Sequence, residues 1–152
     1  MIDASIIRAH QHASGARGGQ EQQALGKSSG GWSSKIHAKV DALGMPLKFI
    51  ISAGQRQESP FSEQLIGADI SDYLIADRGY DSDEFRNILL SRGTTPVIPV
   101  KYDLYLYKER NFVERFFNRV KHFRRIATRY DKTVAMYLAG LTLVSILIWI
   151  KL

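Results

Sequence analysis

The sequence predicts an α/β fold in which a mixed sheet is flanked by helices. Short runs that are typical of strands alternate along the chain with segments of helical periodicity. The chain has 152 residues, of which 45% are hydrophobic and 24% charged, so it can bury a core, and one domain is expected. It contains no cysteine, which excludes a disulfide framework, a zinc finger and a zinc ribbon.

The N-terminal part is expected to supply the first strand and a loop. Residues 2–8 form an apolar run with the pattern of a short strand, and Asp3 lies within it. An acid is disfavoured in a strand, so Asp3 is either at an edge or functional. Residues 13–34 are rich in Gly, Ser and Gln and lack apolar periodicity, which predicts a long flexible loop.

The next elements are a hairpin and a short helix. Residues 34–41 and 47–52 read as two strands, with a glycine and a proline marking the turn between them. The segment 59–66 is expected to be helical. Ser59 is the candidate N-cap and Pro60 fits the first turn.

A buried strand is predicted at residues 73–76, and it ends directly before Asp77. Acids at the carboxyl end of such a strand lie where open α/β sheets place their ligands. The alternative interpretation of Asp77 is a turn-forming residue. A helix is expected over 84–90, with Asp81 or Ser82 as its N-cap.

Two further elements follow. Residues 95–100 are predicted to form a strand at an edge or strand end, because the run contains two prolines. In the segment 133–152, residues 134–150 are seventeen residues without a charge, at the lower limit for a membrane span. A helix that is apolar all round can equally be buried within a domain, and this interpretation is preferred.

The most informative segment is 107–121, which is predicted to be an amphipathic helix. Tyr107, Arg110, Glu114 and Lys121 share one stripe, at spacings of three, four and seven residues. The opposite face is apolar and consists of Phe112, Val113, Phe116, Phe117, Val120 and Phe123. The simplest interpretation of the stripe is a solvated helix face with spaced charges.

The net charge of +6 is concentrated in residues 107–132, which contain three acids and nine basic residues. The basic residues are Lys108, Arg110, Arg115, Arg119, Lys121, Arg124, Arg125, Arg129 and Lys132. Such a localised excess is typical of a protein that binds a polyanion. Nucleic acid is the favoured polyanion, and a membrane surface is the second choice.

Three motifs resemble one family of enzymes. The pattern Y-x2-R-x3-E-x6-K, formed by Tyr107, Arg110, Glu114 and Lys121, resembles the glutamate signature of DDE insertion-sequence transposases. The continuation, residues 121–132, is similar to members of insertion-sequence family five. The segment A-D-R-G-Y-D-S-D, which contains Asp77, resembles the second-aspartate block of the same family.

The resemblance implies a ribonuclease-H-like catalytic domain over residues 1–152, with the C-terminal helices at 107–152. Asp3, Asp77 and Glu114 would be the catalytic and metal-binding residues, holding two Mg²⁺ ions for which Mn²⁺ can substitute. The implied reaction is strand cleavage of DNA by water, followed by attack of the freed 3′-hydroxyl on target DNA. The residues expected to contact DNA are Tyr107, Arg110, Lys121, Arg115, Arg119, Arg124 and Arg125.

Several expectations concern the context of the chain. It begins two residues before Asp3, whereas the family carries a DNA-binding region there, so a second reading frame or a truncated copy is expected, inactive alone. The expected partners are DNA and either a second copy or the product of an upstream frame, with no membrane. No secretory leader is recognisable, which favours the cytoplasm. The alternatives are a non-catalytic DNA-binding fragment, a non-transposing nuclease and a small membrane-anchored basic protein.

Overall fold

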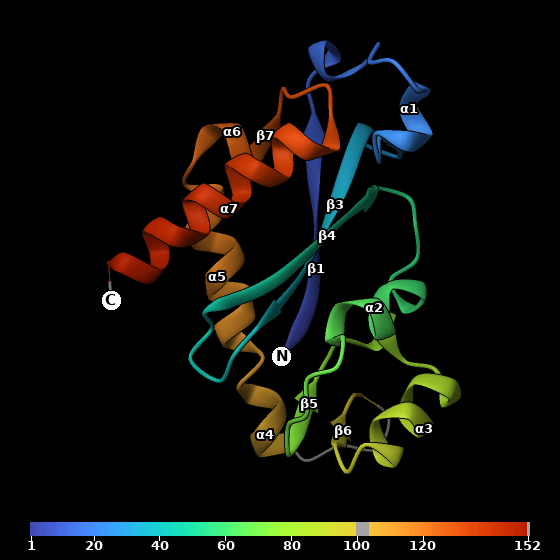
Figure 1. Ribbon diagram of the computed structural model, residues 1–152, viewed down its shortest axis with the longest axis vertical. Helices are drawn as coiled ribbons and strands as arrows, with labels where there is room; N and C mark the ends of the chain where they lie inside the picture. Colours follow the sequence, from blue (N-terminus) through green and yellow to red (C-terminus); the bar gives the residue numbers. More distant parts are fainter. Residues whose placement is uncertain (100–103, 152) are drawn as a thin grey trace.

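The computed structural model describes residues 1–99 and 104–151 and contains a curled mixed sheet flanked by helices (Figure 1). The strands are β1 (Ile2–Ala9), β2 (Gly26–Ser28), β3 (Gly31–Val40), β4 (Pro46–Ala53), β5 (Tyr73–Ile75), β6 (Thr95–Val97) and β7 (Thr128–Arg129). The α-helices are α1 (Gly19–Gln22), α2 (Ser62–Ile66), α3 (Asp83–Ser91), α4 (Leu104–Lys108), α5 (Asn111–Lys121), α6 (Arg124–Ala127) and α7 (Val134–Ile150). Short 3₁₀ turns are η1 (Gln11–Ala13), η2 (Ser59–Phe61) and η3 (Arg78–Tyr80).

Strand β1 lies at the centre of the sheet. It pairs antiparallel with β3 on one side. On its other side it meets two elements, because Ile2 bridges Ala76 in parallel and Arg8 pairs with Thr128 of β7. β5 in turn pairs in parallel with β6. The predicted mixed sheet is confirmed, and this arrangement sets β1 beside the strand that leads to Asp77.

The predicted hairpin of β3 and β4 is confirmed, and its turn packs against α5. The Asp41 carboxylate accepts hydrogen bonds from the backbone N–H groups of Leu43 and Met45, both at 2.8 Å. Gly44 has a φ of +79°, a left-handed conformation that suits glycine. A Cβ at this position would lie 2.9 Å from the Phe112 carbonyl oxygen. The turn therefore needs glycine both for its backbone conformation and for close contact with α5.

The two faces of the sheet bury different clusters. Because side chains alternate along a strand, Ile36 and Ala38 of β3 point to one face while His37 points to the other. The first face packs against α5 and α7, and its core includes Ile7, Ile36, Ala38, Val113, Phe116, Phe117, Tyr137 and Leu141. The second packs against α2 and α3, and its core includes Ile2, Leu65, Leu74, Ala76, Tyr80, Phe85 and Leu89. Helices on opposite sides of the sheet are visible in Figure 1.

The predicted flexible loop at residues 13–34 was wrong. The segment contains α1 and β2 and reaches the beginning of β3, with which β2 pairs. Leu25 is buried, and the Ser34 hydroxyl donates to the Ala24 carbonyl at 2.7 Å. Arg129, distant in sequence and fully buried, donates to the same Ser34 hydroxyl at 2.7 Å. A long-range contact thus orders a segment whose local composition favours a loop.

The N-cap of the helix predicted at residues 59–66 differs from expectation, whereas that of the helix predicted at 84–90 is as expected. Ser59 was expected to cap α2, but it begins the turn η2 and the helix starts at Ser62 with no side-chain cap. The Ser62 hydroxyl donates instead to the Ser59 carbonyl at 2.6 Å. Helix α3 is capped by Ser82, whose hydroxyl accepts from the Phe85 N–H at 3.1 Å. The predicted N-cap Ser59 is therefore wrong, and of the two candidates for α3 the N-cap is Ser82.

The strand predicted at 95–100 is shorter in the structure, where β6 ends at Val97; residues 98 and 99 are not in a strand, and residue 100 lies outside the described residues. The predicted helix at 107–121 is divided into α4, which ends at Lys108, and α5, which begins at Asn111. Arg110 lies at the junction with a helical backbone (φ −53°, ψ −25°), so it stays one turn before Glu114. Four members of the predicted apolar face are buried, whereas Phe112 is half-buried and Phe123 is 37% exposed.

In the C-terminal part, the sequence predicted helix α7 but not strand β7. Strand β7 interrupts the region expected to be wholly helical, because Thr128 and Arg129 pair with the end of β1. The apolar segment forms the predicted helix α7. Within the described ranges, no helix is long and apolar enough to cross a membrane.

Candidate active site

Asp3 lies on the central strand and is almost fully buried, with 7% of its side chain exposed. One carboxylate oxygen, Oδ1, accepts a hydrogen bond from the Ala4 N–H at 2.8 Å. Burial raises the pKa of Asp3 to about 6, against the lowering influence of Arg110 and the Ala4 N–H, and nearby Asp77 raises it further. Burial of this charged carboxylate at the centre of the sheet is therefore unfavourable in desolvation free energy.

Asp77 follows the bridge between Ile2 and Ala76, which sets it beside Asp3 on the neighbouring strand. Its Oδ1 accepts from the Arg78 N–H at 2.6 Å and caps the turn η3, so the predicted turn-forming role is real. Its Oδ2 is directed elsewhere and lies 3.3 Å from an Arg110 nitrogen. The side chain is 41% exposed, so this acid is accessible to solvent.

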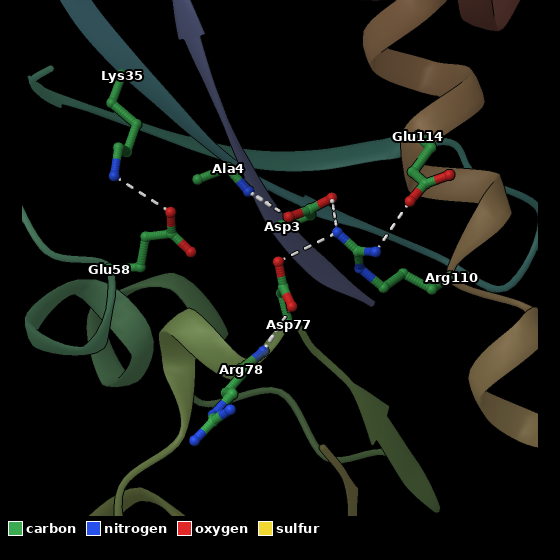
Figure 2. Close-up of polar contacts among 8 residues, drawn as sticks. All are labelled: Asp3, Ala4, Lys35, Glu58, Asp77, Arg78, Arg110 and Glu114. Carbon is green, nitrogen blue, oxygen red and sulfur yellow. Dashed lines mark hydrogen bonds and ion pairs between the residues drawn. The ribbon is translucent and has the colours of Figure 1, made fainter. Parts of the chain in front are cut away.

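Glu114 approaches the two aspartates from α5. Its Oε1 lies 2.9 Å from Nη1 of Arg110, one helical turn earlier, and 49% of its side chain is exposed. The other terminal nitrogen of Arg110, Nη2, lies 3.1 Å from Oδ2 of Asp3. Three carboxylates from separate elements therefore meet around one guanidinium, as Figure 2 shows.

The donor set of this cluster suits a hard divalent cation. All three side chains offer carboxylate oxygens, which Mg²⁺ prefers, and Mg²⁺ commonly binds through few carboxylates together with water. The cluster already surrounds one positive charge, the Arg110 guanidinium. Arg110 Nε is buried, and no hydrogen-bond partner for it lies within residues 1–99 and 104–151. Among the described residues, no three acids or histidines are gathered closely enough to form a ready-made metal site.

A buried hydrogen-bonded group behind the cluster was missed by sequence reasoning. The His37 ring lies 3.0 Å from the Tyr80 hydroxyl through Nδ1 and 2.8 Å from the Ser52 hydroxyl through Nε2. Burial, with a contribution from the charge of Lys35, lowers the pKa of His37 to about 4. Tyr80 closes the turn η3 that begins after Asp77. The group therefore ties the Asp77 turn to the sheet.

A second missed feature is an ion pair beside the same turn. Glu58 and Lys35 are 3.1 Å apart and largely shielded from solvent, with 20% and 10% of their side chains exposed. A Cβ at Gly79 would collide with the Glu58 carboxylate, so the turn passes close to this acid. Figure 2 shows the pair on the Asp77 side of the cluster. Neither contact leaves a signal in local sequence, because the partners are more than twenty residues apart.

The residues predicted to bind DNA are distributed along α5 and α6. The Tyr107 ring centroid is 6.0 Å from Cζ of Arg110, so the tyrosine lies next to the acid cluster. Lys121 is eleven residues beyond Arg110, about 16 Å along a helix, and lies away from the cluster. Exposed side chains between and beyond them are Arg115, Arg119, Arg124 and Arg125, the last of which pairs with Asp131 at 3.1 Å. Their role in DNA binding stays a prediction.

Comparison with known proteins gives a consistent result. Residues 1–108 match the family described as the transposase DDE domain, a range that includes Asp3 and Asp77 and ends before Glu114. The chain is 34% identical over 132 residues to a proposed transposase for insertion sequence element IS6501 of Brucella ovis, covering 78% of this chain and 98% of that protein. It is 32% identical over 125 residues to a proposed transposase for insertion sequence element IS402 of Burkholderia cepacia, covering 72% of this chain and 59% of that protein. No solved structure matches significantly.

Proposed function

The chain belongs to the transposase DDE domain family of insertion-sequence transposases, and on this premise we propose that Asp3, Asp77 and Glu114 are its catalytic acids. Transposases of this family act on DNA by phosphoryl transfer and generally use divalent metal ions. The proposed activity is Mg²⁺-dependent cleavage of a DNA strand, followed by transfer of its 3′ end. Residues 1–152 form the catalytic domain in this proposal, and membership of insertion-sequence family five stays a prediction.

The observation that carries the proposal is the meeting of three carboxylates from β1, the end of β5 and α5 around one positive charge. The three carboxylates would hold two Mg²⁺ ions, or Mn²⁺ in their place, and such ions would supply activation of the attacking oxygen and stabilisation of the leaving oxygen. Asp3 supplies a fixed, buried ligand. Asp77 and Glu114 are half-exposed, so both are accessible from solvent.

The protein's own side chains provide the remaining parts of the proposed mechanism. Arg110 and Lys121 bind phosphate groups, and the Tyr107 ring orients Arg110 or stacks on a base. The basic side chains of α5 and α6 position the duplex, because phosphate contacts release counterions. Water and then a DNA 3′-hydroxyl are the attacking groups, so the proposal requires no covalent protein nucleophile. Self-association, or association with the product of an upstream frame, would bring two DNA ends together.

The test is the Glu114→Gln variant in a complete enzyme that includes a DNA-binding region, assayed for Mg²⁺-dependent strand transfer with DNA that carries the element's own terminal sequences. We expect transfer to be lost while DNA binding, measured by fluorescence anisotropy, is retained. The matched control is Glu109→Gln, an exposed acid outside the cluster, which should retain transfer. Wild-type transfer by Glu114→Gln would refute the assignment.

The second candidate is a DNA-binding fragment without catalysis. It is favoured by the ion pairs of Arg110, which offset part of the negative charge of the acid cluster without any metal. Under that hypothesis DNA affinity should depend on salt but not on Mg²⁺, and neither cleavage nor transfer should occur with wild-type protein.

A further inference from the structure

The two aspartates of the cluster use their oxygens in the same way. In each, Oδ1 accepts a hydrogen bond from the backbone N–H of the next residue, at 2.8 Å for Asp3 and 2.6 Å for Asp77. The remaining oxygen of each, Oδ2, lies against the same atom, Nη2 of Arg110, at 3.1 and 3.3 Å. Figure 2 shows this nitrogen between the two carboxylates. Arg110 therefore contacts the two oxygens that the backbone leaves available.

A divalent ion and the Arg110 guanidinium would compete for this position. Mg²⁺ binds carboxylate oxygens at about 2.0–2.1 Å, so an ion shared by both Oδ2 atoms would lie in the region that Nη2 contacts. Two cations at such short separation repel strongly within a partly buried site. The ion pair with Glu114 extends the same competition to the third carboxylate.

The hydrogen bonding of Arg110 is incomplete in the observed position. Its Nε is buried and has no hydrogen-bond partner among the described residues, although its terminal nitrogens contact all three acids. A buried donor without a partner is unfavourable, because its hydration is lost without replacement. An arginine satisfies such a donor when it binds a phosphate in a bidentate manner. In the observed position the charge of Arg110 is well placed between the carboxylates, whereas its Nε–H remains available to a different partner.

From these contacts we propose that Arg110 is an internal counterion that holds the place of the divalent ion in the metal-free protein. On metal entry the guanidinium leaves the carboxylates and binds a DNA phosphate. The inference rests on the proposed function, since it requires that the three acids bind metal. The displacement of Arg110 couples the two ligands. Metal binding releases the guanidinium for a DNA phosphate, and phosphate binding keeps it away from the carboxylates, so each ligand should raise the affinity for the other.

The test measures Mn²⁺ binding by calorimetry at pH 8 in the absence of DNA. Arg110→Gln should bind Mn²⁺ about tenfold more tightly than wild type, because the ion no longer displaces a charge-assisted hydrogen-bonded group. The control is Arg56→Gln, which makes the same change in an exposed ion pair with Glu21 and should bind as wild type does. Equal or weaker binding by a folded Arg110→Gln variant would overturn this inference alone. Absence of Mn²⁺ binding in wild type and variant alike would overturn the metal site and this inference together.

A measurement on the wild-type protein keeps the inference testable if Arg110→Gln does not fold. The Nε–H signal of Arg110 can be followed by ¹⁵N NMR and assigned by its loss in Arg110→Lys. In the metal-free protein this N–H is buried, so it should exchange slowly with solvent, and saturation with Mg²⁺ should accelerate the exchange. Binding of Mg²⁺ without any change in this signal would contradict the displacement of Arg110.

Discussion

Replacing Asp3 by asparagine should stabilise the metal-free protein at neutral pH. The carboxylate is 7% exposed, and its pKa is raised from 3.8 to about 6, chiefly by burial. The folded protein therefore holds the Asp3 proton more tightly than the unfolded chain does, and stability falls as the pH rises from about 4 to 6. A difference of about two pH units corresponds to about 3 kcal/mol. Asparagine resembles the protonated acid and avoids this cost.

The assay is urea unfolding of wild type and Asp3→Asn in the presence of a chelator, at intervals between pH 4 and pH 8. Near pH 4 the two proteins should have similar free energies of unfolding, because wild-type Asp3 is protonated when folded. Above pH 6 the variant should be more stable by about 3 kcal/mol. Comparing the two proteins at each pH removes the contributions of other titrating groups.

The control is Asp72→Asn, which removes an exposed carboxylate and should change stability by no more than about 0.5 kcal/mol at any pH. A wild-type protein more stable than Asp3→Asn at pH 8 would refute the reasoning. That result would mean that the ion pair with Arg110 outweighs the cost of burying the carboxylate.

Two further predictions concern the elements that support the site. Burial lowers the pKa of His37 from 6.5 to about 4. The free energy of unfolding of wild type, relative to that of His37→Gln, should therefore fall by about 3 kcal/mol as the pH decreases from 6.5 to 4. A difference between the two proteins that does not change with pH would contradict this prediction. Gly44→Ala should lower the free energy of unfolding by about 1–3 kcal/mol, because the residue has a left-handed backbone and its Cβ would press on the carbonyl of Phe112. An unchanged urea midpoint would show that the turn and α5 can separate at no cost.

Much of the fold could be predicted because its signals are local. The hairpin follows from alternation and a Gly/Pro turn, and α3 begins at Ser82 because the serine hydroxyl satisfies a backbone donor of the first turn. In contrast, β2 and β7 are short, polar strands that exist through pairing with β3 and β1. Arg129 of β7 also donates a hydrogen bond to the Ser34 hydroxyl and so links β7 to β3. A local pattern carries no record of such a contact.

The same distinction applies to the candidate site. The pairing of Arg110 with Glu114 follows from their spacing of four residues on a helix, which sequence alone can supply. The family resemblance also selected Asp77, which lies in a motif, and Asp3, which lies in the first strand, although their catalytic role stays a prediction. The contacts of Arg110 with both aspartates could not be predicted, because they depend on how α5 lies across the sheet. For that reason the sequence indicates Arg110 only as a DNA contact.

The position of Arg110 and the raised pKa of Asp3 are two consequences of one physical problem. Carboxylates gathered to bind divalent ions repel one another and lose hydration when no ion is present. The fold offsets this cost in part with one guanidinium, and the remaining cost appears as the raised pKa of the most buried acid. A counterion held more firmly would make the metal-free protein more stable but would oppose entry of the metal. The unpartnered Nε of Arg110 and the exposure of Asp77 and Glu114 are what a displaceable counterion requires.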